Sequence, residues 1–317
     1  MPKDESLAHS ENSPGVVLTR RGFLYTPFVA LAVQLAGARE SWGALRKPLR
    51  FGIVTDCHYA DREAKGSRCY RESLPKLCEC VDLMNQQRVE FLIELGDFKD
   101  QDDPPAVERT LAYLRRVETE FRRFRGRRYH VLGNHDMDSL SKAQFLAEIK
   151  NTRIPANRSH YSFNAQGLRG IVLDANYSGD GSDYDRGKFD WTDANVPSAQ
   201  LAWLAKELDA APSPVVVFVH QRLDGVGDVF VKNAAEVRAV LERSGKVQAV
   251  FHGHHHDGAY SKINEIHYYT LKAVVVGSGA ESNSYAVVEI TPAGAMTITG
   301  FRRAVSAEFA PRPSGLG

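Results

Sequence analysis

Short apolar runs alternate with helix-like segments from residue 49 onward, and this alternation limits the possible folds more than any other feature of the chain. Six runs have the length and the content of buried strands, namely 49–55, 89–95, 128–132, 169–174, 214–220 and 246–251. Helical patterns lie among them at 72–87, 105–124, 141–150, 198–210 and 233–244. Ser198 is the expected N-cap of the fourth helix. The first three strands and their helices predict βαβ units in a mainly parallel α/β sheet.

Three later segments, 265–277, 284–290 and 295–303, have the pattern of consecutive strands. We expect hairpins to join them, which would give a second, mixed sheet. Residues 176–196 form a long connection rich in glycine and aspartate. Its spacing does not match a calcium-binding EF-hand, and we expect a surface loop or a lid on the substrate side.

Composition limits the partners that the chain can bind. The 317 residues include 43% hydrophobic and 25% charged side chains, enough for one large globular domain or two small ones. The net charge of +1 provides no overall field for nucleic acid or an anionic membrane. Segment 115–128 is rich in arginine, but its interleaved glutamates and apolar positions favour a solvated helix face over a stable nucleic-acid contact.

The four cysteines, Cys57, Cys69, Cys78 and Cys80, lie close together in the sequence but do not form two CxxC pairs. On a helix, Cys78 and Cys80 would point to different faces. Free or buried thiols are therefore expected rather than a zinc site, and one disulfide remains an alternative.

The amino-terminal segment has the features of a targeting sequence. Arg20 and Arg21 precede an apolar stretch at 28–36, and an A-x-A pattern follows at 36–38. This segment resembles a bacterial twin-arginine export signal, and the apolar stretch is too short and too interrupted for a membrane span. We therefore expect a signal peptide at 1–38, a single domain at 39–317, and export of the folded protein by the twin-arginine machinery to the periplasm or beyond, without a membrane anchor after processing. The alternative is an amino-terminal helix that is retained.

Side chains that carry chemistry follow the predicted strands directly. Five segments supply them: Asp56 and His58; Asp97; Asn134, His135 and Asp136; His220; His254 and His256. Because open α/β sheets bind ligands outside the carboxyl ends of their strands, we expect these segments to converge on one pocket.

The residue types in these segments indicate the chemistry of the pocket. Carboxylates, imidazoles and one amide, without a thiolate, suit two divalent ions such as manganese, iron or zinc. Asp97 has two carboxylate oxygens and follows a glycine, so it is the natural bridge between the ions. Two ions about 3.5 to 4 Å apart can share a hydroxide and clamp an in-line displacement at phosphorus. The sequence therefore predicts hydrolysis of a phosphate ester or anhydride.

The ordered motifs D-x-H, GD, GNHD, a single H and GHxH, between residues 51 and 256, resemble those of the calcineurin-like metallophosphoesterases. This resemblance implies a four-layer α/β/β/α sandwich of two mixed β-sheets flanked by helices. It also implies that one metal ion is bound by Asp56, His58, Asp97 and His256. The other would be bound by Asp97, Asn134, His220 and His254. His135 would be the proton donor or a phosphate contact, oriented by Asp136.

In the histidine cluster of residues 252–256, we expect His254 and His256 to lie on one side of an alternating backbone. His255 would then point to the other side, and His252 would pack behind the ligands.

Segments 56–77, 96–101 and 253–261 are most similar to the manganese-dependent ADP-ribose/CDP-alcohol diphosphatases. That similarity implies cleavage of small nucleotide diphosphate compounds. The chain departs from the pattern at His58, where eukaryotic members carry glutamine, and at Gln221-Arg222, where many relatives have H-x-P. Asp100 stands where purple acid phosphatases carry tyrosine, which disfavours that class.

Several functional alternatives remain open at this point: a phosphomonoesterase, a phosphodiesterase of broad specificity, a nuclease, or a metal-binding scaffold without activity. The candidate substrate contacts are Arg68, Tyr70 and Arg71, which could place a guanidinium near a second phosphate or a base. A surface role at a helix start is the alternative for these three. The sequence does not indicate the native metal pair or the oligomeric state.

Overall fold

The computed structural model describes residues 45–211 and 214–311 of the chain, so the expected signal peptide at 1–38 lies outside the described residues. The described residues form two six-stranded sheets. The first sheet has the order β12 (Ala307–Phe309), β11 (Met296–Arg302), β10 (Ser284–Ile290), β1 (Leu49–Val54), β2 (Phe91–Glu94) and β3 (Arg127–His130). The second has the order β4 (Tyr161–Ala165), β5 (Leu168–Val172), β6 (Val215–Phe218), β7 (Val247–His252), β9 (Ile266–Thr270) and β8 (Ala259–Ile263).

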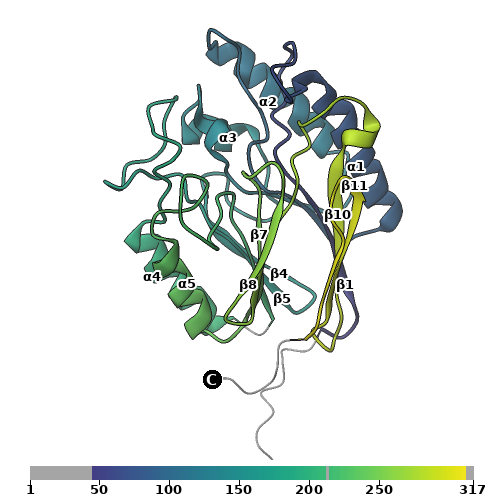
Figure 1. The fold of residues 1–317 in the computed structure, drawn as a ribbon, viewed down its shortest axis with the longest axis vertical. Helices are drawn as coiled ribbons and strands as arrows, with labels where there is room; N and C mark the ends of the chain where they lie inside the picture. The colour runs from purple at the N-terminus through teal and green to yellow at the C-terminus, as the bar shows by residue number, and fades with distance from the viewer. Residues whose placement is uncertain (1–44, 212–213, 312–317) are drawn as a thin grey trace, which may run out of the picture. The chain divides into compact units, whose positions relative to one another are not determined.

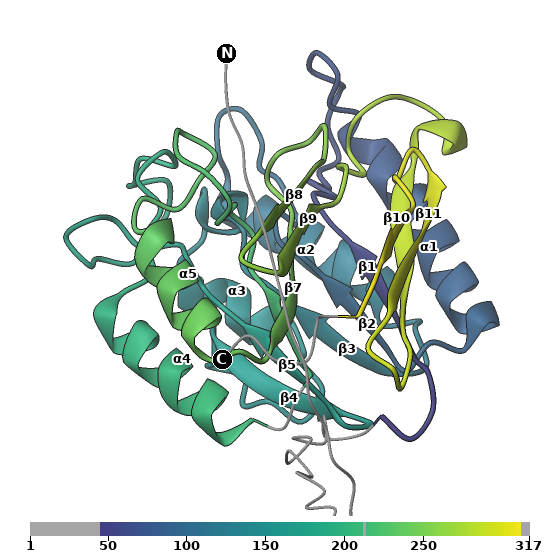
Figure 2. The same ribbon diagram turned by 60° about the horizontal axis from the view of Figure 1, so that its bottom comes forward.

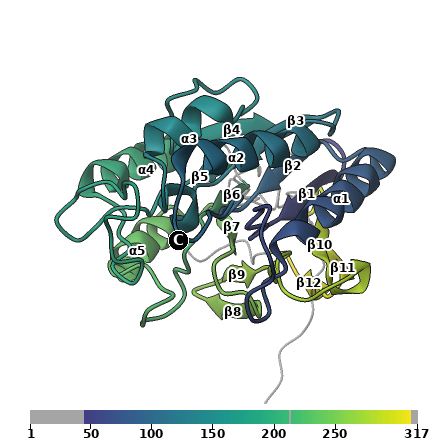
Figure 3. The same cartoon turned by 90° about the horizontal axis from the view of Figure 1, so that it is seen from above.

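Helices cover the outer face of each sheet (Figures 1 and 3). One apolar cluster joins the first sheet to α1 (Ser73–Gln87), α2 (Val107–Phe121) and α3 (Lys142–Glu148). Another joins the second sheet to α4 (Ser198–Ala210) and α5 (Ala234–Arg243). Three short 3₁₀ turns, η1 (Tyr70–Glu72), η2 (Asn134–Met137) and η3 (Ala280–Ser282), complete the elements. The expected four-layer α/β/β/α sandwich is therefore confirmed.

A layer of aromatic side chains fills the space between the two sheets. Phe51 of β1 stacks on Phe91 of β2, with 4.7 Å between ring centroids, and meets Phe218 of β6 edge-on at 6.0 Å. Successive side chains of a strand point to opposite faces, so Phe51 enters this layer while Val54 packs under the helices. Strands buried on both faces explain the continuous apolar runs of the sequence.

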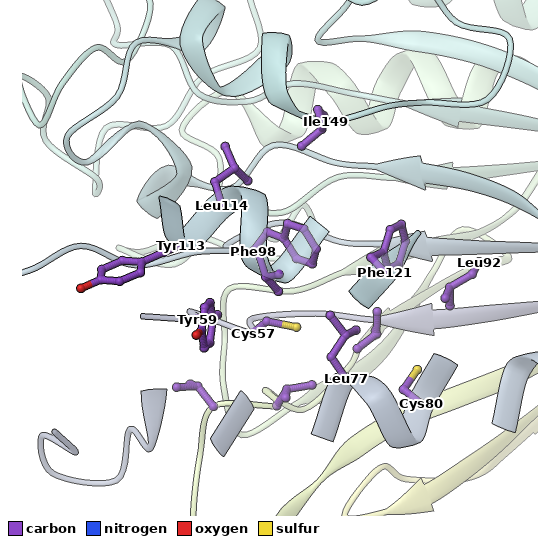
Figure 4. Close-up of a cluster of buried hydrophobic side chains, with 14 of the residues drawn as sticks. Cys57, Tyr59, Leu77, Cys80, Leu92, Phe98, Tyr113, Leu114, Phe121 and Ile149 are labelled. Atoms are coloured by element: carbon purple, nitrogen blue, oxygen red, sulfur yellow. The ribbon is translucent and has the colours of Figure 1, made fainter. Parts of the chain in front are cut away.

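The parallel pairing of β1 with β2 and of β2 with β3 confirms the predicted βαβ units. The pairing brings the carboxyl ends of these strands to one edge of the sheet. Apolar residues hold the loops that follow: Cys57 and Phe98 lie in the core under α1 and α2, close to Leu77 and Phe121 (Figure 4). The residues on either side of Cys57 and Phe98 are therefore fixed at this edge of the sheet.

A second, mixed sheet is present, but the expectation that the three carboxyl-terminal strands form it through successive hairpins is wrong. β9 belongs to the second sheet, where it runs parallel to β7, whereas β10 and β11 extend the first sheet. β10 pairs antiparallel with β1, and only β10 and β11 form a hairpin of the kind expected. The chain between β9 and β10 crosses from one sheet to the other (Figure 2). The sequence did not indicate this crossing, because segment 271–277 has the composition of a strand and was predicted to continue β9.

Three strands that the sequence pattern did not predict, β4, β8 and β12, are all edge strands. Edge strands are short or half exposed, so they lack the apolar runs of central strands. In β8, for example, no residue is fully buried. The N-cap of α4 is Pro197 rather than Ser198, which is the first helical residue.

The four cysteines are free thiols, with Cys57 and Cys80 buried. The arginines of segment 115–128 include four that form ion pairs with carboxylates, for example Arg115 with Glu148 and Arg127 with Glu90. These pairs agree with a solvated helix face. Among the described residues, no helix is both long enough and apolar enough to cross a membrane.

Candidate metal centre

The ligand-type residues that follow the strands of both sheets converge into two adjoining groups. Asp56, His58 and His256 form the first group, and Asp97, His220 and His254 form the second. In the first, the Nε2 atom of His256 lies 3.3 Å from Oδ1 of Asp56 and 3.2 Å from Nε2 of His58. We call this group site 1 and the other group site 2.

Asp97 lies between the two groups. Its Oδ2 atom is 3.5 Å from Nε2 of His58 in site 1 and 3.1 Å from Nε2 of His220 in site 2. One carboxylate oxygen therefore faces ligand atoms of both sites, as a bridging ligand requires.

The donor set fits two divalent ions. Four buried donor atoms of these segments have no hydrogen-bond partner among the described residues: Asp56 Oδ1, Asn134 Oδ1, His220 Nε2 and His254 Nε2. Buried polar atoms are normally satisfied, and unsatisfied ones at a shared position indicate a ligand. Carboxylate, amide and imidazole donors without thiolate suit manganese, iron or zinc.

Hydrogen bonds on the far ring nitrogen orient two of the imidazoles. The Nδ1 atom of His220 lies 2.8 Å from the carbonyl oxygen of Leu95, and Nδ1 of His58 lies 3.1 Å from Oδ2 of Asp100. These partners leave both Nε2 atoms directed at the site, the usual arrangement around a metal-binding histidine. Asp100 thus positions a ligand.

Burial and the neighbouring charges set the protonation of the ligand imidazoles and carboxylates. Burial opposes the charged form of His58, but the hydrogen bond to Asp100 and the nearby carboxylate of Asp56 outweigh it and raise the pKa to about 9. Burial, followed by the charge of His220, lowers the pKa of His254 to about 3. For Asp97, burial raises the pKa, but His220 and His135 overcome this effect and hold the pKa well below its ordinary value. The Asp97 carboxylate is therefore ionised and can attract a cation.

Four of the ligand-type residues have left-handed backbone conformations. The φ angles are 52° at Asp56, 44° at His58, 57° at Asp97 and 67° at His254. Residues other than glycine rarely adopt positive φ, and such conformations cost roughly 1 to 3 kcal/mol each. Strain of this kind concentrates at functional sites, where the surrounding packing holds it.

The left-handed conformation of His254 corrects one expectation about the histidine cluster. β7 ends at His252, and residues 254–257 form bends and turns rather than an alternating strand. His254 and His256 therefore reach different sites instead of sharing one side of a strand. His252 does lie behind the ligands, where its Nε2 atom accepts a hydrogen bond from the N–H of Leu223.

His135 lies beside site 1, and its ring centroid is 4.6 Å from that of His58. Asp136 does not orient it: the Asp136 carboxylate accepts hydrogen bonds from the backbone N–H groups of Asp97, Phe98 and Gly133. Asp136 holds the ligand loops together because its short side chain, on η2, turns back toward them. The carboxylates nearest the His135 ring are Asp100 and Asp138, each 3.7 Å from Nδ1.

Lys99 holds the segment that carries His135. Its buried Nζ atom donates to the carbonyl oxygen of His135 at 2.6 Å and to the Asp138 carboxylate. The backbone N–H of His135 also donates to Oδ1 of Asp97. His135 is thereby fixed relative to the residue that bridges the two sites.

The segment 271–277 connects the loops of the two sheets. Its backbone N–H groups donate to the carbonyl oxygens of His252, His256, Thr55, Asp56 and Ser67. Leu271, Ala273, Val274 and Val275 of this segment are buried, which explains its strand-like composition. The segment therefore connects two ligands of site 1, Asp56 and His256, that lie far apart in the sequence.

The three candidate substrate contacts have different positions. Arg68 lines a cavity beside site 1, with its NH1 atom 3.7 Å from Oδ2 of Asp100. Tyr70 also lines the cavity but is buried beneath the guanidinium of Arg62, which lies 4.3 Å from the ring centroid. Arg71 does not line it, because its guanidinium is paired with Asp61 and Glu63 on the surface.

The loop 176–196 reaches the opposite part of the centre. Trp191, which is 44% exposed, lies with its ring centroid 5.6 Å from that of His254 in site 2. Sequence reasoning did not identify Trp191, Lys99 or Asp138, and it noted Asp100 only as a departure from another class. Lys99 and Asp100 in the GDFKD stretch, and Asp138 in the GNHDMD stretch, lie within a few residues of predicted ligands, which is a weak sequence signal for a role in the site. Trp191 has no such signal.

Two adjoining groups of carboxylate and imidazole ligands, at the carboxyl ends of strands from two packed α/β layers, define a metal-dependent phosphoester hydrolase with a dimetal-binding fold. The chain belongs to the calcineurin-like phosphoesterase family, whose model matches residues 49–258.

Relatives and solved structures agree with this assignment. A manganese-dependent ADP-ribose/CDP-alcohol diphosphatase of Oryza sativa subsp. japonica is 28% identical, over 73% of this chain and 85% of that protein. A protein of the same name from Arabidopsis thaliana is 27% identical, over 73% of this chain and 88% of its own length. The crystal structure of a dimetal phosphatase from Danio rerio has a TM-score of 0.71, with 21% identity, and the match covers 82% of this chain and 98% of that one.

Proposed function

We propose that this enzyme hydrolyses the pyrophosphate bond of small nucleoside diphosphate compounds of the ADP-ribose and CDP-alcohol type. The observation that carries the proposal is the similarity to two diphosphatases of that name along most of their length. The cavity beside site 1 supports it, since a diphosphate needs room for a second phosphate next to the phosphorus that reacts.

In this proposal, Asp56, His58, Asp97 and His256 hold one divalent ion, and Asp97, Asn134, His220 and His254 hold the other. When bound, two such ions lower the pKa of a shared water and neutralise charge on the phosphoryl oxygens. His135 donates a proton to the departing oxygen, and the carboxylates of Asp100 and Asp138 each lie 3.7 Å from its Nδ1 atom. Lys99 keeps His135 at its place beside Asp97.

A substrate panel tests the proposal. Purified protein is stripped of metal, reloaded with manganese, iron or zinc, and assayed with ADP-ribose, CDP-choline, a bis-aryl phosphodiester, an aryl monophosphate and single-stranded DNA. We expect no turnover without metal, and a kcat/KM for one of the diphosphates at least about 10-fold above that for the other substrates. A preference for the monophosphate or for DNA would replace the proposal by a phosphomonoesterase or a nuclease. Full activity of the metal-free protein would contradict the metal assignment as well.

A further inference from the structure

A cavity of about 630 Å³ opens beside site 1 and is not part of the ligand set. Asp100 and His135 form the wall nearest the metal centre. Arg62, Lys65 and Arg68 contribute three positive charges to the rest of the lining, and Asp102, Asp103 and Asp138 contribute three negative ones. An anionic group in this cavity, next to the proposed proton donor, would therefore have to lie against the basic side chains.

The two arginines of this cavity are held in different ways. Arg62 is already engaged, because its NH1 atom donates to the carbonyl oxygen of Gln101 at 2.6 Å and its guanidinium stacks on Tyr70. The side chain of Arg68 is 31% exposed, and the nearest charged partner of its guanidinium among the described residues is Asp100, at 3.7 Å. That separation is too long for a hydrogen bond, so the planar donor fork of Arg68 is available to a ligand.

The backbone of Arg68 is fixed, although its side chain makes only the long ion pair with Asp100. Its N–H donates to the carbonyl oxygen of Lys65, and its own carbonyl oxygen accepts from the N–H of Lys65. The next residue, Cys69, donates to Val275 in the segment that connects the ligand loops. Arg68 is thus presented from a rigid hairpin, as a specific anion contact requires.

The position of His135 indicates which half of a substrate would lie in the cavity. One donor atom of His135 lies within 4.8 Å of donor atoms of both His58 and Asp97, and the same residue lines the cavity. A general acid must lie next to the oxygen that leaves, so the departing group extends to the side of His135 that the cavity occupies. At the other part of the centre, Trp191 offers an exposed indole next to His254, which suits stacking of a nucleobase.

We propose that this cavity is the subsite for the leaving half of a nucleoside diphosphate substrate, with Arg68 binding its phosphate. This inference rests on the proposed function and adds the orientation of the substrate to it. The nucleoside half lies toward Trp191 with its phosphorus at the two metal sites. The carboxylate of Asp103 in the cavity lining suits the hydroxyl groups or the ammonium group of the leaving half.

The bonds formed and broken follow from this orientation. The oxygen of a water molecule forms a bond to the phosphorus of the nucleoside half while the bond from that phosphorus to the bridging oxygen breaks. The bridging oxygen remains with the leaving half and accepts a proton from His135, and the attacking water gives up a proton in exchange. No oxidant, reductant or further reactant is needed.

Matched variants of two neighbouring arginines test the role of the cavity. We expect Arg68→Gln to lower kcat/KM for ADP-ribose roughly 10- to 100-fold, because a charge-assisted contact to phosphate is lost. The loss should be far smaller for a bis-aryl phosphodiester, which has no second phosphate. Arg71→Gln is the control, and both activities should stay near those of the unaltered enzyme because Arg71 lies outside the cavity.

Equal losses of both activities in Arg68→Gln, or no loss of either, would overturn the subsite. If the unaltered enzyme cleaved the phosphodiester but neither ADP-ribose nor CDP-choline, the proposed function itself would fail. Hydrolysis of ADP-ribose in ¹⁸O-labelled water tests the orientation independently. The label should appear in AMP, and label in ribose phosphate would reverse the assignment of the two halves.

Discussion

Two glycines beside the ligand residues leave no room for a side chain. A Cβ atom at Gly253 would lie 2.1 Å from Oγ1 of Thr55 and 2.8 Å from Oδ2 of Asp56. At Gly133 it would lie 2.2 Å from both the backbone nitrogen and Oδ1 of Asp97. Backbone from one loop therefore packs directly on carboxylates from another, and the position of each carboxylate depends on the absence of a side chain.

Gly253→Ala should weaken metal binding without unfolding the protein. The added methyl group must displace Thr55 or Asp56, and changes that shift the support of a ligand typically cost about 10- to 100-fold in metal affinity. Titration of metal-free protein with manganese measures the effect. Gly179→Ala is the control, because a Cβ there meets nothing closer than 3.3 Å. If Gly253→Ala bound manganese with unchanged affinity, the close packing of Gly253 on Thr55 and Asp56 would not be needed for metal binding.

His135→Asn should separate proton donation from metal binding. The variant should keep both metals and lose roughly 10²- to 10⁴-fold in kcat, with the larger losses for alkyl leaving groups, which need a proton most. Metal content and kcat are measured on the same preparation. His220→Asn is the comparison, and it should lose metal first. If His135→Asn lost metal, His135 would be a ligand. If the variant kept the kcat of the unaltered enzyme for both alkyl and aryl substrates, His135 would be a structural residue.

At the scale of elements, a buried charged cluster joins three of them behind the metal centre. His130 of β3 lies between two carboxylates, with Nδ1 3.4 Å from Glu94 of β2 and Nε2 3.2 Å from Glu118 of α2. Burial disfavours the imidazolium, but the charge of Glu118 and the hydrogen bonds to both carboxylates raise the pKa of His130 to about 9. The helix and the two strands are thus linked through a charged histidine.

This cluster predicts a loss of stability at alkaline pH. The folded pKa of about 9 exceeds the ordinary value of 6.5, so the folded state holds a proton that the unfolded state releases. The stabilisation is complete below pH 6.5 and is lost as the pH rises through 9, by about 3 kcal/mol. His130→Gln should therefore flatten the decline of the free energy of unfolding over this range, measured by urea titration.

His267→Gln is the control for this measurement, because burial lowers the pKa of His267 to about 4 and it stays neutral throughout. An equally steep decline in His130→Gln and in the unaltered protein would assign the pH dependence to other groups.

The burial of a strand decided whether the sequence could predict it. Central strands such as β1 and β6 are buried on both faces and appear as apolar runs, whereas the half-exposed edge strand β8 has no such signal. Segment 271–277 misled the prediction because it is buried without being a strand. Ligands were predictable because they directly follow strands, but Trp191 reaches the centre only through the fold of a distant loop, which no local spacing encodes.

At the scale of the whole molecule, the ligand residues come from both sheets. Asp56, His58 and Asp97 follow strands of the first sheet, and His220 and His254 follow strands of the second. The two metal sites therefore exist only when the sheets are packed on each other. A protein of this kind must fold before it can hold its metals, and an export route that carries folded proteins suits it.

We propose that the chain is exported through the twin-arginine route. Replacing Arg20 and Arg21 by lysine should retain the protein in the cytoplasm of a bacterial host that has this route, as measured by fractionation and by the mature amino terminus. The same replacement at Arg115 and Arg116 is the control and should leave export unchanged. Export of the Arg20 and Arg21 variant at the normal level, or a mature protein that still contains Arg20, would contradict the signal.

The pairing of β10 with β1 has a consequence for the order in which the protein can mature on the ribosome. β1 is among the first strands to be synthesised, and its neighbour on one side is made only after every ligand residue has emerged. Until then, one edge of β1 has no partner, although all the donor groups are present. Because the two metal sites exist only when both sheets are packed, we expect metal binding to follow the synthesis of the last strands rather than that of the ligand residues.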